Sequence, residues 1–224
     1  TGVQTCALPI CGYAFTLALQ QDGRVRAWGD NWSRNYPSGI GQCDVPPDLG
    51  VATEIAAGTL HSVALLADGS VRAWGSNDNA QCEGPPDSGG VVREKPANLG
   101  ATSHIAAGDQ TTVAVLADGG VAAWGANFYG ECDAPRSTGR FSQVSAGTEY
   151  VMGVRADGSI EGWGRNDWGQ VGGPSSQGVR GRPEPMPPCV KVSAGERHTL
   201  AIRNDGQDRK STRLNSSHAN ISYA

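Results

Sequence analysis

Short apolar runs recur along the chain in pairs, and each pair is separated by Asp-Gly. The runs 62–66 and 71–74 are rich in Val, Leu, Ala and Trp, a composition that favours strands. The Asp68-Gly69 pair between them tolerates the positive φ of a tight hairpin turn. A third short apolar run, 55–57, precedes the pair. The pattern therefore predicts a hairpin with a third strand beside it.

This unit repeats. Copies start near Cys11, Ile55, Ile105, Val144 and Val192. Their first glycine stands 11 residues before the glycine of Asp-Gly in all five copies, and the Asp stands 6 residues before Trp in four. A lone hairpin is marginal in water, so the copies are expected to stack as radial blades. The residues that define the repeat are Gly58, His61, Asp68, Gly69, Trp74, Gly75, Gly108, Asp118, Gly119, Trp124, Gly147, Asp157, Gly158, Trp163, Gly195 and His198.

The amino-acid composition further restricts the fold class and the kinds of partner. The 224 residues include 32 glycines and are 38% apolar, which favours a turn-rich all-β fold over a helical one. The net charge of −4, with no basic stripe, argues against a nucleic-acid partner. No apolar stretch approaches the roughly 18 residues of a membrane span, so no membrane partner is expected.

The stretch IAAGTLHSVAL, followed by DG and WGxN, resembles the repeat of the regulator of chromosome condensation. The short copies are similar to the compact form found in the propeller that inhibits β-lactamases. Phe15, Thr111 and Tyr150 depart from the pattern, standing where His61 and His198 stand. The resemblance covers residues 11–207. It implies a seven-bladed β-propeller, of which this chain would hold about four and a half blades.

The two ends of the chain do not follow the repeat. TGVQTCALPI and DRKSTRLNSSHANISYA both read as translations of a sequencing-library adapter. We therefore expect residues 1–10 and 208–224 to be adapter-derived, which leaves 11–207 as the propeller. These ends are expected to pack little against the blades, and the fifth blade is expected to be incomplete.

Candidate chemistry is sparse. Cys43, Cys82 and Cys132 each follow Gln or Glu after the Trp-Gly loop and lack C-x-x-C spacing, so they predict packing and no metal site. His61 and His198 share one repeat position, which favours a structural role over catalysis. The Asp residues of the Asp-Gly pairs form a series of turns. No nucleophile, phosphate-loop or dinucleotide motif is present, so we expect no enzyme activity and no cofactor.

Large aromatic residues gather in the variable segments after Trp-Gly. Equivalent loops of a radial repeat lie on one rim, where aromatic residues are typical binding anchors. The alternative is that each ring folds back to cap its own blade. The candidate rim residues are Trp32, Tyr36, Phe128, Tyr129 and Trp168.

Together these features favour a non-catalytic scaffold that binds a protein partner and is monomeric when its ring is complete. Two alternatives follow from the family resemblance: a guanine-nucleotide exchange factor for a small GTPase, and a protein inhibitor of an enzyme. The acidic balance argues against chromatin as the partner.

Overall fold

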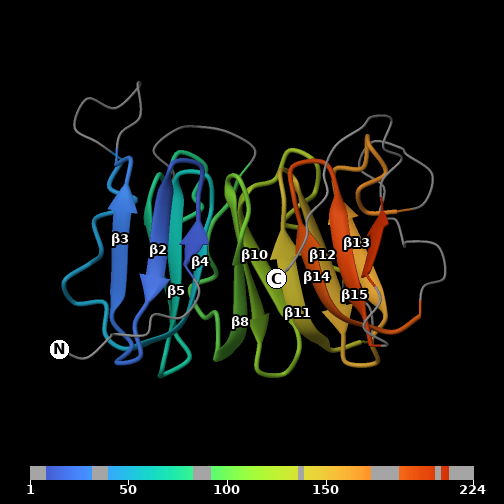
Figure 1. Cartoon of the computed structure of the whole chain (residues 1–224), viewed down its shortest axis with the longest axis horizontal. Coiled ribbons are helices and arrows are strands. Elements are labelled where there is room, and N and C mark those ends of the chain that lie inside the picture. The colour runs from blue at the N-terminus through green and yellow to red at the C-terminus, as the bar shows by residue number, and fades with distance from the viewer. Residues whose placement is uncertain are drawn as a thin grey trace.

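The structure, a computed structural model, describes residues 9–31, 40–82, 92–135, 139–172, 187–204 and 208–211. Five antiparallel sheets stand beside one another in chain order (Figure 1). The sheets are β1 (Ile10–Cys11), β2 (Phe15–Leu19), β3 (Val25–Gly29); β4 (Ala52–Ala57), β5 (His61–Leu66), β6 (Val71–Gly75); β7 (Val92–Arg93), β8 (Thr102–Ala107), β9 (Thr111–Leu116), β10 (Val121–Ala126); β11 (Phe141–Ala146), β12 (Tyr150–Arg155), β13 (Ile160–Gly164); and β14 (Cys189–Ala194), β15 (Thr199–Arg203), β16 (Asp208–Ser211).

Each sheet is one blade of a partial propeller, which confirms the predicted all-β fold. In the second blade the order is β4-β5-β6, and the other blades repeat this arrangement, with β7 added outside β10 in the third. The strands that open successive blades contact one another, β4 with β8, β8 with β11 and β11 with β14, and form the inner wall. In the described part of the chain, no helix is long and apolar enough to cross a membrane.

The Asp-Gly pairs form the predicted hairpin turns. Gly69 has φ +81, and the glycines of the three other described pairs adopt nearly the same value. The Asp68 carboxylate accepts hydrogen bonds from the Ser70 amide and hydroxyl at 2.9 and 2.6 Å. These aspartates are therefore turn-forming groups. The fifth aspartate of the series, Asp205, lies outside the described residues.

A β-bulge recurs in the inner strands of blades two to five, which the sequence pattern did not predict. In β4 the pairing shifts between Ala52 and Glu54, so that Thr53 is the extra residue, and its hydroxyl donates to the Leu65 carbonyl. A bulge redirects the side chains that follow it. Here those residues are Glu54, His104, Gln143 and Lys191.

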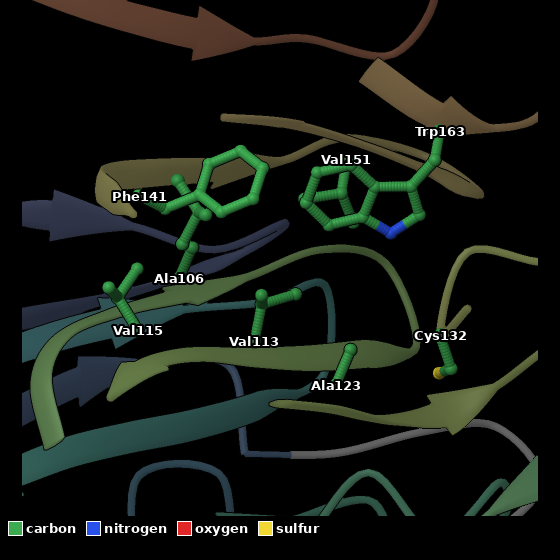
Figure 2. Close-up of a cluster of buried hydrophobic side chains, with 9 residues drawn as sticks. Ala106, Val113, Val115, Ala123, Cys132, Phe141, Val151 and Trp163 are labelled. Carbon is green, nitrogen blue, oxygen red and sulfur yellow. The ribbon is translucent and has the colours of Figure 1, made fainter. Parts of the chain in front are cut away.

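The hydrophobic core lies between blades and not within them. Figure 2 shows one such cluster, in which Val113 and Ala123 of the third blade face Val151 and Trp163 of the fourth. The rings of Phe141 and Trp163 meet edge to face, with centroids 5.8 Å apart. Because each core needs two neighbouring blades, the stack is the unit of stability.

The expectation that the chain ends pack little against the blades is wrong for the few end residues whose backbone is described. Asp208–Ser211 forms β16, which pairs with β15 and completes a three-stranded fifth blade. Ser211 lies opposite Thr199, at the register position that Trp163 holds opposite Val151. At the other end, Ile10 of β1 pairs with Leu17 of β2. An unpaired strand edge accepts backbone hydrogen bonds from almost any extended segment, which accounts for this pairing. The adapter origin of residues 1–10 and 208–224 stays a prediction.

Candidate protein-binding face

One end of the blades carries two sets of loops. The middle strand of each blade starts at the turn that follows the first glycine, and the outer strand returns to the same end, where the Trp-Gly loop begins. We call this the loop end. It comprises the described parts of the glycine turns (12–14, 58–60, 108–110, 147–149, 195–197) and of the Trp-Gly loops (29–31, 40–45, 75–82, 125–135, 164–172).

An asparagine clamps each Trp-Gly loop. The side-chain oxygen of Asn77 accepts the Cys82 amide at 2.9 Å, and Asn127 binds Cys132 at 2.8 Å in the same way. Equivalent bonds join Asn31 to Cys43 and Asn166 to Val171. The Cys82 and Cys132 thiols are buried and donate to loop carbonyls at 3.2 and 3.1 Å. The WGxN motif and its cysteine thus close the loop.

The residue before that cysteine latches the loop to the next blade. The carbonyl oxygen of Gln81 accepts the Trp124 indole N–H at 3.1 Å and the Thr112 hydroxyl at 2.7 Å. In the same manner, the backbone carbonyl of Gln42 accepts hydrogen bonds from the Trp74 indole and the Ser62 hydroxyl, and that of Glu131 accepts one from the Trp163 indole. Each loop is therefore fixed from two sides, by its own asparagine and by the neighbouring blade.

The side chain of this Gln or Glu holds the loop tip. The Glu131 carboxylate accepts the backbone amides of Phe128 and Tyr129 at 3.2 and 2.8 Å. Gln170 accepts the Trp168 amide at 2.9 Å. Burial raises the pKa of Glu131, although these amide hydrogen bonds oppose the shift. The candidate rim aromatics therefore sit on pinned backbone, which keeps the entropy cost of presenting them low.

The rim aromatics differ in exposure. Phe128 is 52% exposed and Trp168 54%, so neither ring is buried in its own blade. Tyr129 is half-buried beneath Arg165, whose guanidinium lies 4.7 Å from the ring centre. Trp32 and Tyr36 lie outside the described residues. Their role, like that of the whole rim, stays a prediction.

Two arginines organise the rim around Trp168. Arg165 forms ion pairs with Glu149 and, at 2.7 Å, with Asp167. Arg197 pairs with Glu196 at 3.1 Å and stands over the Trp168 ring, 4.9 Å from its centre. A guanidinium over an indole is a cation–π contact worth about 0.5–1 kcal/mol at an exposed site. One face of the Trp168 ring is therefore already in contact with a cation of the chain itself.

The first glycines of the copies meet at the inner wall. They line a hollow of about 300 Å³ at the loop end, together with Tyr13, Asp109 and Glu196. A Cβ built on Gly108 would lie 2.6 Å from the Gly147 carbonyl oxygen, and one on Gly58 equally close to that of Gly108. Only glycine permits this approach of the blades.

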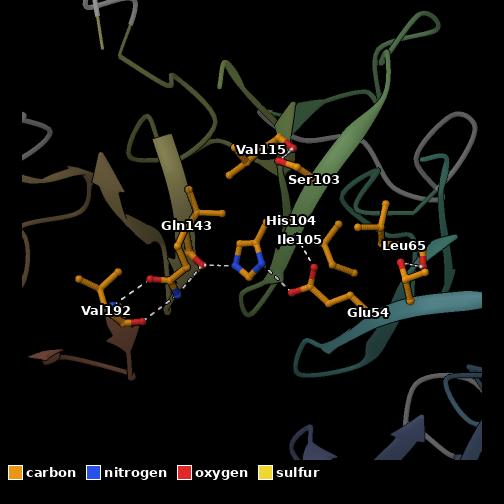
Figure 3. Close-up of polar contacts among 10 residues, drawn as sticks. Glu54, Leu65, Ser103, His104, Ile105, Val115, Gln143 and Val192 are labelled. Carbon is orange, nitrogen blue, oxygen red and sulfur yellow. Dashed lines mark hydrogen bonds and ion pairs between the residues drawn. The ribbon is translucent and has the colours of Figure 1, made fainter. Parts of the chain in front are cut away.

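The residues that follow the bulges link neighbouring blades. His104 contacts the Glu54 carboxylate at 2.6 Å through Nδ1 and the Val144 carbonyl at 3.1 Å through Nε2 (Figure 3). Gln143 continues the series by donating to the Val192 carbonyl and accepting its amide. Burial alone would lower the pKa of His104, but the hydrogen bond and charge of Glu54 outweigh it, so the pKa is raised.

His61 also joins neighbouring blades. Its ring is fully buried, and Nε2 lies 3.1 Å from the Thr112 hydroxyl of the next blade. At the same position Tyr150 donates its hydroxyl to the His198 carbonyl at 2.5 Å. Burial lowers the pKa of His61 from 6.5 to about 4.

His61→Phe is expected to flatten the pH dependence of stability. Because the folded-state pKa of His61 is depressed, its contribution is complete above pH 6.5 and is lost as the pH falls toward 4. At pH 5 this loss is about 2 kcal/mol. The urea midpoint should therefore decrease less between pH 7 and pH 5 in the variant than in the wild type. Phenylalanine is chosen because Phe15 holds the same repeat position in the first copy. Equal falls in both proteins would contradict the assignment.

Sequence reasoning missed two exposed aromatics. Tyr13 projects from the first glycine turn, and Trp28 is 51% exposed on the edge of the first blade. Trp28 has the same register as Trp74, opposite the second residue of its middle strand. Among the described residues, no three His, Cys, Asp or Glu side chains gather as metal ligands.

Comparisons with known proteins identify the repeat. A model of the regulator of chromosome condensation repeat matches residues 11–34, 52–81 and 103–131, and a second model of this repeat matches 157–202. A search of curated protein sequences found no match.

Solved structures with the same fold include Prp20p from Saccharomyces cerevisiae, described with its binding properties to Gsp1p and histones (TM-score 0.76, 19% identity, 92% of this chain and 58% of that chain). Yeast RCC1 (Prp20) bound to Kap60 matches with TM-score 0.70 and 20% identity, over 88% of this chain and 54% of that chain. Human WBSCR16 matches with TM-score 0.75 and 18% identity, over 93% of this chain and 62% of that chain. The chain thus spans little more than half the length of these proteins. With its family-model matches across more than half of its residues, the chain belongs to the family built from regulator of chromosome condensation repeats.

Proposed function

We propose that this chain is a non-catalytic interaction scaffold whose loop end holds a protein partner. The observation that carries the proposal is the pair of half-exposed rings, Phe128 and Trp168, on loops fixed by Glu131 and Gln170. Large rings left in water gain nothing for folding, whereas rigid aromatic anchors dominate the energy of many interfaces.

The relatives support a binding role in general terms. Prp20p is described with its binding properties to Gsp1p and histones, and a solved structure shows Kap60 bound to yeast RCC1 (Prp20). These partners belong to that protein, and its similarity of 19–20% identity to this chain is a similarity of fold.

The test is a comparative capture. The whole chain is immobilised as wild type, as Phe128→Ala/Trp168→Ala, and as the control Val51→Ala/Val190→Ala, whose side chains are equally exposed outside the loop end. Partners retained by wild type are identified and titrated. The rim variant is expected to bind a genuine partner at least 30-fold more weakly, the equivalent of about 2 kcal/mol, while the control binds normally.

Two outcomes would overturn the proposal. Equal affinity of the rim variant and the wild type would exclude these anchors. Accelerated nucleotide release from a small GTPase on addition of the chain, unchanged in the rim variant, would instead support the exchange-factor alternative.

A further inference from the structure

The charge of the loop end specifies what kind of segment it can hold. Its described loops carry eight acidic side chains that are at least partly exposed and two basic ones, which gives these loops a net charge of 2 − 8 = −6. The acidic residues are Asp30, Asp44, Asp78, Asp109, Asp133, Glu149, Asp167 and Glu196, and the basic residues are Arg165 and Arg197. The turns and links of the opposite end carry six acidic and three basic residues in their described parts, so the imbalance is larger at the loop end.

Exposed aromatics lie at this end as well. Tyr13, Phe128 and Trp168 are exposed in the turns and loops of this end, whereas Trp28 is exposed on the open edge of the first blade. Both rings that touch a loop-end arginine, Tyr129 and Trp168, receive it over the ring face. The rings therefore suit guanidinium and ammonium groups as well as apolar contacts.

The hollow at the inner wall offers a place for a long cationic side chain. Its volume of about 300 Å³ is lined by Asp109 and Glu196 and also by Thr59 and Thr148. Asp109 forms no ion pair within the described part of the chain, whereas Glu196 is paired with Arg197. A second, smaller hollow lies beside Trp168, lined by Arg165, Arg197 and Glu196.

We infer that the occupant of the loop end is a lysine- or arginine-rich segment of a protein, which places cationic side chains against Asp109 and Glu196 and over the exposed rings. This inference rests on the proposed function and adds the chemistry of the partner. Complementary charge raises the association rate and excludes acidic competitors, and the aromatic rings supply the short-range contact.

The experiment uses the whole chain and two fluorescein-labelled peptides, (Arg-Gly-Lys-Gly)₃ and (Glu-Gly-Asp-Gly)₃. Fluorescence anisotropy at 150 mM NaCl is expected to show binding of the basic peptide only. Asp109→Asn/Glu196→Gln should weaken that binding at least fivefold. The control Asp22→Asn/Asp48→Asn removes the same charge at the opposite end and should change it less than twofold.

The arms of the experiment separate the possible failures. Equal weakening in both double variants would mean that only net charge attracts the peptide, and would overturn the inference. Absence of basic-peptide binding at 150 mM NaCl would overturn it as well. A captured partner that needs Phe128 and Trp168 but is indifferent to Asp109→Asn/Glu196→Gln would refute the inference and leave the proposed function standing.

Discussion

Trp74→Ala is expected to lower the free energy of unfolding by about 3–5 kcal/mol, the range for truncating a buried aromatic ring. Trp74 is 8% exposed and packs between the first and second blades, against the cluster of Phe15, Leu17 and Ile55. Its indole N–H donates to the Gln42 carbonyl at 3.2 Å. The substitution therefore opens a cavity between two blades and breaks one latch.

The matched control is Trp28→Ala. The pentapeptide VRAWG is identical at 25–29 and 71–75, but Trp28 is 51% exposed. Its truncation should lower stability by less than about 1 kcal/mol. Urea unfolding of the two variants compares the same local sequence with and without a neighbouring blade. Similar losses at both positions would show that Trp74 does not act through the inter-blade core.

Gly108→Ala is expected to destabilise the chain by about 3 kcal/mol, at the upper end of the range for overpacking. The added Cβ would lie 2.6 Å from the Gly147 carbonyl oxygen and 3.2 Å from the Ala146 Cβ. Gly108 does not have positive φ, so steric conflict between blades is the cause. A backbone carbonyl of the next blade cannot rotate away as a side chain can, so the blades must separate.

Gly120→Ser provides the control for this prediction. Gly120 also lacks positive φ, and its nearest neighbour is the side chain of Asp118, which can move. The equivalent residues Ser70 and Ser159 donate their hydroxyls to Asp68 and Asp157 at 2.6 Å. We expect Gly120→Ser to be neutral or slightly stabilising, and Gly108→Ala to lower the Tm by roughly 6–12 °C. A Tm of Gly108→Ala within 2 °C of wild type would disprove the close packing at the inner wall.

Local sequence predicted what depends on local geometry. The Asp-Gly turns, the strands on either side and the recurring Trp position follow from the fixed spacing. The bulges at Thr53 and Ser103 could not be predicted in this way, because an extra residue in an inner strand shows only when the pairing is known. The pairing of β16 with β15 was missed for a related reason, since an open strand edge selects weakly among extended segments.

At the loop end, too, some features can be predicted from local sequence and others depend on contacts between blades. The aromatics of the Trp-Gly loops are visible in the sequence, and so is WGxN. That Gln81 and Glu131 present their carbonyls to the next blade depends on contacts between residues 31 and 32 positions apart, Gln81 with Thr112 and Glu131 with Trp163. The exposure of Trp28, with the same neighbours in sequence as Trp74, depends on what lies beside its blade. Burial at an inter-blade position is a property of the stack.

The asparagine clamp has a consequence for how this protein can diversify. The Asn127–Cys132 and Asn77–Cys82 bonds, of 2.8 and 2.9 Å, join residues five positions apart, yet Asn31 binds Cys43 twelve positions away at 2.8 Å. This clamp spans seven more residues than the other two, and it keeps both the closing bond and the Gln42 latch. Mutation and insertion within the clamp can therefore change the recognition surface while the blade junction stays intact. New specificities could arise, or be grafted, one loop at a time.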